Sequence, residues 1–263
     1  MRRHSAAALV LSLPLLGAAA SAACAELTVF VTGSMADPLE HAAHDFTLDT
    51  GHTLRFERAT TGGLLTKIRA GERGDVIVIA AEAAATLEQD GAIVAGSRVP
   101  VASSLFGIVV RAGGPMPNVA TPEAFKETVL RAPTISYPDP VAATVSGGYI
   151  ESVFDNLGIK GTARAKAQLK PMGYLVGEAV ASGEAALGLS FMSEFVANPA
   201  LTVVPFPEPL QKPQLYTAGV FAGSSNADAA RELLAFLTSS AAREKLSAAG
   251  VVPANSSAAD SVR

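Results

Sequence analysis

The sequence predicts an α/β fold in which parallel strands alternate with helices, and three observations support this class. Runs rich in β-branched and aromatic residues, such as 27–32, recur along the chain. They are followed by segments such as 39–46, whose apolar residues have the spacing of a buried helix face. Asp75 is followed by an uninterrupted apolar run to Ala80, which is typical of a strand covered on both sides of a sheet. This alternation predicts right-handed crossovers.

The individual elements follow in order from local patterns. The first helix follows Gly33-Ser34-Met35, and a later helix begins with a threonine cap and a proline at Thr121-Pro122. Predicted strands cover 27–32, 53–58, 75–80, 104–111, 134–137, 186–191, 201–206 and 215–221. Further helices are predicted over 64–71, 149–157, 176–182, 227–237 and 241–249. Because no flexible linker interrupts the alternation of strands and helices, we expect two lobes joined by strands that cross between them.

The N-terminus has the pattern of a cleaved signal peptide. Arg2 and Arg3 precede an apolar run over 6–20, and Ala23-Cys24-Ala25 supplies small residues at a cleavage site. The run is shorter than the roughly 20 residues of a membrane-spanning helix. We expect 1–25 to be removed on export to the periplasm. Cys24 is the single cysteine, so the mature chain would contain no disulfide.

Composition narrows the class of partner. The formal net charge is −4 and the chain has no tryptophan, so a nucleic-acid surface and aromatic stacking platforms are not expected. Net charge would not attract an anion either, so local dipoles would have to bind one.

Familiar catalytic and metal-binding spacings are absent from the sequence. There is no phosphate-binding glycine loop, no dinucleotide fingerprint and no nucleophile elbow. His41, His44 and His52 are isolated from other ligand types, and we expect all three at the surface. We therefore expect neither a metal nor a cofactor, and assign no catalytic residue from the pattern.

Three predicted strands end in small hydroxyl residues and glycine just before a helix. These segments are Gly33-Ser34, Thr60-Thr61-Gly62-Gly63 and Ser146-Gly147-Gly148. A helix start leaves backbone N–H groups unpaired and carries partial positive charge, while glycine lets the backbone approach a ligand closely. Ordinary helix capping explains any one of them. Three at the carboxyl ends of strands predict a site for a small anion.

At these residues the chain resembles the molybdate-binding family of type II periplasmic binding proteins. The resemblance covers Glu26 to Pro253 and rests on Thr32-Gly33-Ser34-Met35, the run 59–78, Asp139-Pro140 with Gly147-Gly148-Tyr149, and 183–188. It implies two lobes, each a mainly parallel sheet flanked by helices, with the ligand cleft between them. The implied lobes are 26–104 plus 217–263, and 105–216.

The resemblance also implies which residues meet the ligand. Ser34 and Thr61 would donate from one lobe, and Ser146 and the backbone near Gly173 from the other. Met35, Thr60, Gly147 and Phe191 complete the predicted set. Phe191 stands where the family has a tyrosine, and phenylalanine cannot donate a hydrogen bond. Either Ser190 or Ser193 compensates, or the ligand is not molybdate.

Two function classes remain open. The first is an exported, monomeric receptor that binds a molybdate- or tungstate-like oxyanion and delivers it to the membrane subunits of an ABC importer. The second arises because this divergent branch also resembles aconitate isomerase, which moves a proton between allylic carbons of a tricarboxylate. Such an enzyme needs a base and cations, for which the candidates are Arg55, Arg58, Arg98 and Glu194, each otherwise expected on the solvated surface. A receptor for di- or tricarboxylates is a related alternative.

Overall fold

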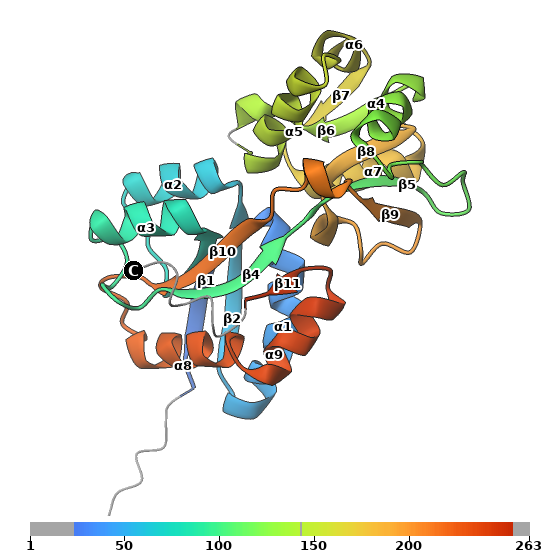
Figure 1. Cartoon of the computed structure of the whole chain (residues 1–263). Coiled ribbons are helices and arrows are strands. Elements are labelled where there is room, and N and C mark those ends of the chain that lie inside the picture. The colour runs from blue at the N-terminus through green and yellow to red at the C-terminus, as the bar shows by residue number, and fades with distance from the viewer. Residues whose placement is uncertain (1–23, 143, 255–263) are drawn as a thin grey trace, which may run out of the picture.

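The computed structural model describes residues 24–142 and 144–254 as two α/β lobes, each built on its own sheet (Figure 1). Residues 1–23, which make up almost all of the predicted signal peptide, lie outside the described part. The α/β fold of two lobes that the sequence predicts is confirmed.

The first lobe contains a six-stranded sheet in the order β11-β4-β10-β3-β1-β2. Its strands are β1 (Glu26–Thr32), β2 (Thr53–Ala59), β3 (Val76–Ala80), β4 (Val99–Ser104), β10 (Gln214–Val220) and β11 (Val252–Pro253). Its helices are α1 (Gly33–Thr50), α2 (Thr61–Arg69), α3 (Ala81–Gln89), α8 (Ala227–Leu237) and α9 (Ser240–Ala248).

The second lobe contains a five-stranded sheet in the order β7-β6-β8-β5-β9. Its strands are β5 (Phe106–Arg111), β6 (Ile135–Pro138), β7 (Ala167–Lys170), β8 (Leu187–Phe191) and β9 (Leu201–Pro205). The helices are α4 (Pro122–Arg131), α5 (Val145–Asn156), α6 (Lys160–Ala165) and α7 (Gly173–Ser182), with short 3-10 turns η1 (Pro140–Ala142), η2 (Met192–Glu194) and η3 (Glu208–Leu210).

Both sheets are mixed rather than mainly parallel. In the first, β1 runs parallel to β2 and β3, as the crossover pattern predicts, but β10 is antiparallel to β3 and β4. In the second, β6 is parallel to β7 and β8, whereas β5 is antiparallel to β8 and β9. The antiparallel strands include those by which the chain passes between the lobes. In each sheet these strands run opposite to the parallel ones.

The first sheet is covered on both faces, as its apolar strands predict. On β1, Val29 and Val31 pack with α1 and α8 on one side, while Phe30 between them packs with α2 and α3 on the other. Each side chain is almost fully buried, and burying one of this size contributes about 1.5–3 kcal/mol. The two buried layers fix the positions of the strand ends, where the helices begin.

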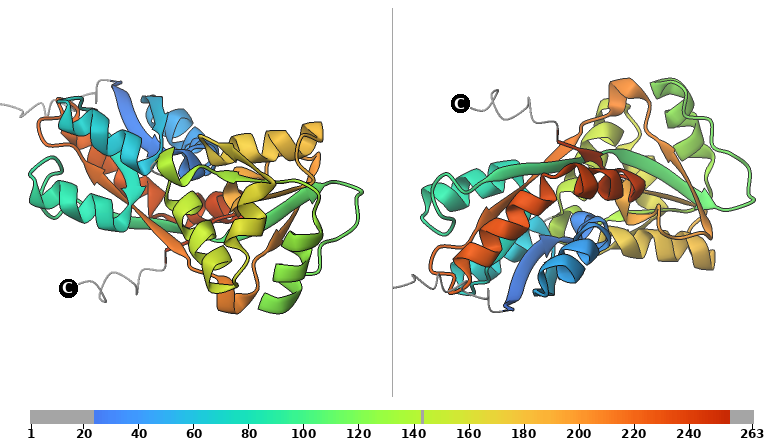
Figure 2. Two further views of the ribbon diagram at one scale, coloured as in Figure 1. Left: turned by 90° about the horizontal axis from the view of Figure 1, so that it is seen from above. Right: turned by 90° about the horizontal axis from the view of Figure 1, so that it is seen from below.

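The chain crosses between the lobes along two neighbouring strands. β4 ends at Ser104 and continues through Leu105 into β5, and the return path enters the first sheet at β10. β4 and β10 lie side by side in the view of Figure 1 and in both views of Figure 2. The lobe boundaries at 104/105 and 216/217 remain a prediction; β10, which contains 216 and 217, starts at Gln214.

The prediction that His52 lies at the surface is wrong. Its side chain is 4% exposed, its Nδ1 accepts a 3.0 Å hydrogen bond from the backbone N–H of Ala25, and its Nε2 lies 3.3 Å from the Glu232 carboxylate. His41 and His44 are exposed as expected. Within residues 24–142 and 144–254, none of the helices is long and apolar enough to cross a membrane.

Candidate functional site

A small pocket of about 30 Å³ lies at the carboxyl ends of strands from both sheets. The first lobe contributes Thr32, Gly33, Ser34, Thr60, Thr61 and, from β10, Tyr216. The second lobe contributes Thr144, Val145, Ser146, Met172, Gly173, Phe191 and Glu194. Most of these are small, hydroxyl-bearing or backbone-exposing residues, and no lysine or arginine is among them.

Four helices begin at this pocket, two from each lobe. They are α1 at Gly33, α2 at Thr61, α5 at Val145 and α7 at Gly173. Each start carries roughly half a positive charge and several N–H groups without partners inside the helix. Their convergence supplies partial positive charge and N–H donors without any cationic side chain, and both favour the binding of a small anion.

The four helix starts are not equivalent. Thr60 caps α2 by accepting a hydrogen bond from the N–H of Gly63, and Thr144 caps α5 by accepting one from Gly147. The residues before α1 and α7, Thr32 and Met172, make no such side-chain bond. The first N–H groups of α1 and α7 therefore keep more of their capacity to bind a ligand.

Thr32 has the clearest unfilled bonding capacity at the site. It is 3% exposed and lines the pocket, and its Oγ1 has no hydrogen-bond partner among the described residues. A buried polar group left without a partner costs about 1–3 kcal/mol. An oxygen of a bound anion would provide that partner.

Tyr216 places a hydroxyl group at the pocket, whereas Phe191 has none. Ser34 Oγ donates a 2.7 Å hydrogen bond to the Tyr216 hydroxyl, which leaves the tyrosine's own proton available to the pocket. The pairing of β10 with β4 shifts register between Tyr216 and Thr217, and such irregularities redirect side chains. The Phe191 ring packs edge-on against Tyr216 at 6.2 Å between centroids, so the two rings are neighbours at the pocket.

Ser190 and Ser193 do not replace the missing donor. Ser190 donates to the carboxylate of Glu194, and Ser193 donates to the backbone oxygen of Ser34 at 2.8 Å. Neither residue lines the pocket in the part of the chain that the structure describes. The Ser193 bond joins the lobes, as does a 3.3 Å bond from Thr60 Oγ1 to the Ala142 oxygen.

Glu194 is part of the pocket, which corrects the expectation of a solvated surface residue. Its side chain lies in η2 and is half-buried, and desolvation by the surrounding protein raises its pKa to about 7. Hydrogen bonds from Ser190 and from the backbone of Phe191 oppose this rise, while the nearby Asp37 carboxylate adds to it. A carboxyl group at the site therefore changes charge near neutral pH.

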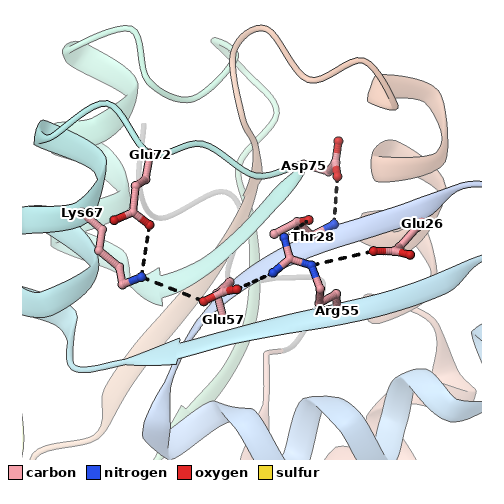
Figure 3. A network of polar contacts seen from close by, with 7 residues as sticks. All are labelled: Glu26, Thr28, Arg55, Glu57, Lys67, Glu72 and Asp75. Carbon is pink, nitrogen blue, oxygen red and sulfur yellow. Dashed lines mark hydrogen bonds and ion pairs between the residues drawn. The ribbon is translucent and has the colours of Figure 1, made fainter.

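The three arginines considered as cations for a tricarboxylate bind carboxylates of the protein elsewhere. Figure 3 shows Arg55 between Glu26, Glu57 and Thr28. Arg58 pairs with Asp37 at 2.8 Å and Glu40 at 2.6 Å, and Arg98 pairs with Glu88 at 2.6 Å. None of the three lines the pocket.

The predicted ligand-contacting residues divide into two groups. Ser34, Thr60, Thr61, Ser146, Gly173 and Phe191 line the pocket. The Met35 side chain is instead fully buried in the core of the first lobe. Gly147 lies beneath the α5 cap, where a β-carbon would be 2.3 Å from the Pro138 oxygen. Whether these residues bind a ligand stays a prediction.

The pocket also contains residues that the sequence does not predict as ligand contacts: Thr32, Thr144, Met172 and Tyr216, together with Glu194, which it gives only as a candidate for isomerase chemistry. Thr144 had a readable signal, because a threonine three residues before Gly147 has the spacing of a helix cap. In the described residues, no group of three or more histidine, cysteine or acidic side chains is placed to hold a metal ion.

Comparison with known proteins gives three results. The family model described as "Bacterial extracellular solute-binding protein" matches residues 27–252. An aconitate isomerase from Pseudomonas sp. is 30% identical over 254 residues, covering 94% of each chain. The molybdate-binding protein ModA of Haemophilus influenzae is 27% identical over 231 residues, covering 86% of this chain and 89% of its own.

The architecture is also that of solved binding proteins. The periplasmic molybdate-binding protein of Azotobacter vinelandii superposes with a TM-score of 0.74 at 20% identity, covering 87% of this chain and 100% of its own. At this identity, the match supports the fold alone.

Proposed function

The chain belongs to the bacterial extracellular solute-binding proteins, in a branch resembling the periplasmic molybdate-binding proteins, and from this we propose that it binds a small anion between its lobes. The convergence of four helix starts on one pocket without a cationic side chain carries this proposal. Uncharged donors bind an anion well when they are fixed in place and shielded from water. The hydroxyl-rich lining suits a molybdate-like oxyanion, whose oxygens accept hydrogen bonds.

The proposed physiological role is that of an exported receptor for an ABC importer. The site is formed by both lobes, so an anion that contacts both favours the arrangement in which they meet. The family resemblance and the proposed signal peptide at 1–25 support export. The membrane subunits of an importer would then be the partner.

The test is calorimetric titration of the mature chain with molybdate, tungstate, sulfate, citrate and trans-aconitate. We expect a tetrahedral oxyanion to bind. Thr61→Ala should weaken binding by about tenfold through loss of a donor, and Ser34→Ala by about tenfold through loss of the hydrogen bond that orients the Tyr216 hydroxyl. Thr121→Ala is the matched control, because Thr121 caps α4, which does not contribute to the pocket. Binding of tricarboxylates alone would reject the oxyanion ligand.

A second candidate function is isomerisation of aconitate, and the position of Glu194 specifically favours it. The aconitate isomerase relative covers nearly the whole chain, and Glu194 places a carboxyl group with a pKa of about 7 in the pocket. A general base is most effective when its pKa lies near the working pH. The absence of a pocket arginine argues against it, since three carboxylates would rely on helix starts alone.

In this second candidate, ionised Glu194 removes a proton from the methylene carbon of cis-aconitate. The electron pair of that C–H bond forms a new double bond to the central carbon, and the pair of the old double bond accepts the proton at the other carbon. Glu194 returns to its ionised form, and the geometry of the new double bond gives the trans isomer. An ultraviolet assay of cis- and trans-aconitate tests this, with Glu194→Gln as the inactive variant. No turnover at high protein concentration rejects it.

A further inference from the structure

The carboxyl group of Glu194 lies between the two helix starts that have no side-chain cap. A β-carbon added to Gly173, the first residue of α7, would be 1.8 Å from Oε2 and 2.2 Å from Cδ of Glu194. A β-carbon added to Gly33, the first residue of α1, would be 3.9 Å from Oε1. The protein therefore places a carboxyl of its own at the junction of α7 from one lobe and α1 from the other.

No positive side chain neutralises this carboxyl among the described residues. The Asp37 carboxylate on α1 raises the pKa of Glu194, and Arg58 binds Asp37 and Glu40 rather than Glu194. β8 contributes the Ser190 hydroxyl, and β10 contributes the buried Tyr216 phenol, whose pKa burial raises. The start of α7 contributes only the uncharged Met172 and Gly173.

An entering anion would thus meet the Glu194 carboxylate in a pocket that contains no cationic side chain. Two negative groups in contact raise each other's proton affinity, and burial increases the effect. When protonated, the carboxyl loses its charge and gains an O–H donor that can bind the anion. The Glu194 carboxyl therefore repels the anion when it is ionised and can donate a hydrogen bond to it when it is protonated.

We propose that the pocket binds its anion together with one proton, which Glu194 holds against the ligand. The inference rests on the proposed anion-binding function and names its ligand class. The ligands are fully ionised oxyanions, because Glu194 and not the ligand carries the proton. The pKa of about 7 supports it, because the proton is then available near neutral pH. As the pH rises above that value, each anion that binds must also recruit a proton from water.

Proton uptake on binding tests the inference directly in the unaltered chain. Molybdate and sulfate, which stay fully ionised across the range, are titrated at about pH 8 in Tris and in HEPES, and the difference in binding heat gives the protons taken up. We expect an uptake approaching one proton per anion. Affinity should fall by about tenfold per pH unit above the pKa of Glu194.

Glu194→Gln provides the second measurement, because the amide has the shape of the protonated carboxyl. We expect this variant to bind without proton uptake, with an affinity independent of pH and higher than that of the unaltered chain at about pH 8. Glu208→Gln on exposed η3 is the matched control and should retain the uptake.

The outcomes separate the two proposals. Binding of either anion without proton uptake overturns this inference and leaves the anion receptor in place. Persisting uptake in Glu194→Gln also overturns it, since the proton would then reside elsewhere. If none of the anions binds, the receptor proposal fails and this inference fails with it. If Glu194 is instead the ionised catalytic base of the second candidate function, aconitate is turned over and no proton is taken up on binding.

Discussion

Ser34 and Tyr216 share a 2.7 Å hydrogen bond between their hydroxyl groups, although 182 residues separate them in the sequence. The bond ties the first turn of α1 to β10, a strand by which the chain passes between the lobes. Because Ser34 donates, the orientation of the Tyr216 proton is left to a ligand. The pair therefore links occupation of the pocket to the connection between the lobes.

Tyr216→Phe should weaken anion binding by about tenfold, because it removes a buried donor and leaves Ser34 without its acceptor. Calorimetry with molybdate or sulfate measures the change. Tyr137→Phe is the matched control, since Tyr137 is equally buried but its hydroxyl bonds Glu151 outside the pocket. Equal affinities of Tyr216→Phe and the unaltered chain would show that Tyr216 is not a donor to the ligand.

Thr32→Val should change affinity and stability in opposite directions. Valine has nearly the same shape, so removing the unpartnered Oγ1 should raise the free energy of unfolding without ligand by about 1 kcal/mol. Anion binding should weaken, because the ligand loses a donor. Urea unfolding and calorimetry measure the two effects.

Ser136→Ala is the comparison for Thr32→Val. The buried Ser136 hydroxyl donates to the backbone oxygen of Gln168, away from the pocket. Its loss should lower stability and leave affinity unchanged. If Thr32→Val also lowered stability in the absence of ligand, the Thr32 hydroxyl would have a partner in solution.

Gly173→Ala should displace Glu194, because the added β-carbon would overlap its carboxyl group. We expect a loss of stability of about 1–3 kcal/mol and of at least tenfold in affinity. Combining it with Glu194→Ala should recover most of the stability, since the colliding atoms are removed. Gly148→Ala is the matched control. Gly148 is an exposed position of α5 with no atom within 4 Å of the new carbon, so the change should be neutral or slightly stabilising.

Glu194 should make the unliganded protein less stable as the pH rises. Its pKa in the folded chain, about 7, lies above the ordinary carboxyl value, so the folded state binds the extra proton more tightly. That contribution is complete below the unfolded pKa and is lost as the pH rises through about 7.

Glu194→Gln removes this dependence. At about pH 8 it should raise the free energy of unfolding by on the order of 2 kcal/mol, and near pH 4 it should change little. Chemical denaturation at both pH values measures the difference. An equal effect at the two values would indicate that the Glu194 carboxyl is not destabilised by its surroundings.

The α/β class and much of the pocket could be predicted because their signals are local. The apolar run at 75–80 identifies a buried strand, and Thr60 and Ser146 lie beside glycines at helix starts. Such patterns depend on the spacing of a few residues. The mixed character of the sheets could not be read in this way, because strand direction depends on where the chain crosses between lobes.

The sequence does not assign Tyr216 to the site and gives Glu194 only as one of four charged candidates, because no local pattern places either residue there. Tyr216 is directed to the pocket by a shift in strand register, and a tyrosine in an apolar strand is usually a core residue. A lone glutamate after a strand is usually solvated, and only the fold brings Glu194 against Gly173. Their positions depend on pairing between segments far apart in the chain.

The two connecting strands also have a mechanical consequence. β4 and β10 are hydrogen-bonded neighbours, so together they resist sliding and twisting but bend easily out of their plane. A pair of strands with one soft direction would let the angle between the lobes change while each sheet stays intact. Because Tyr216 lies on β10 and lines the pocket, such bending would move its hydroxyl relative to the helix starts of both lobes.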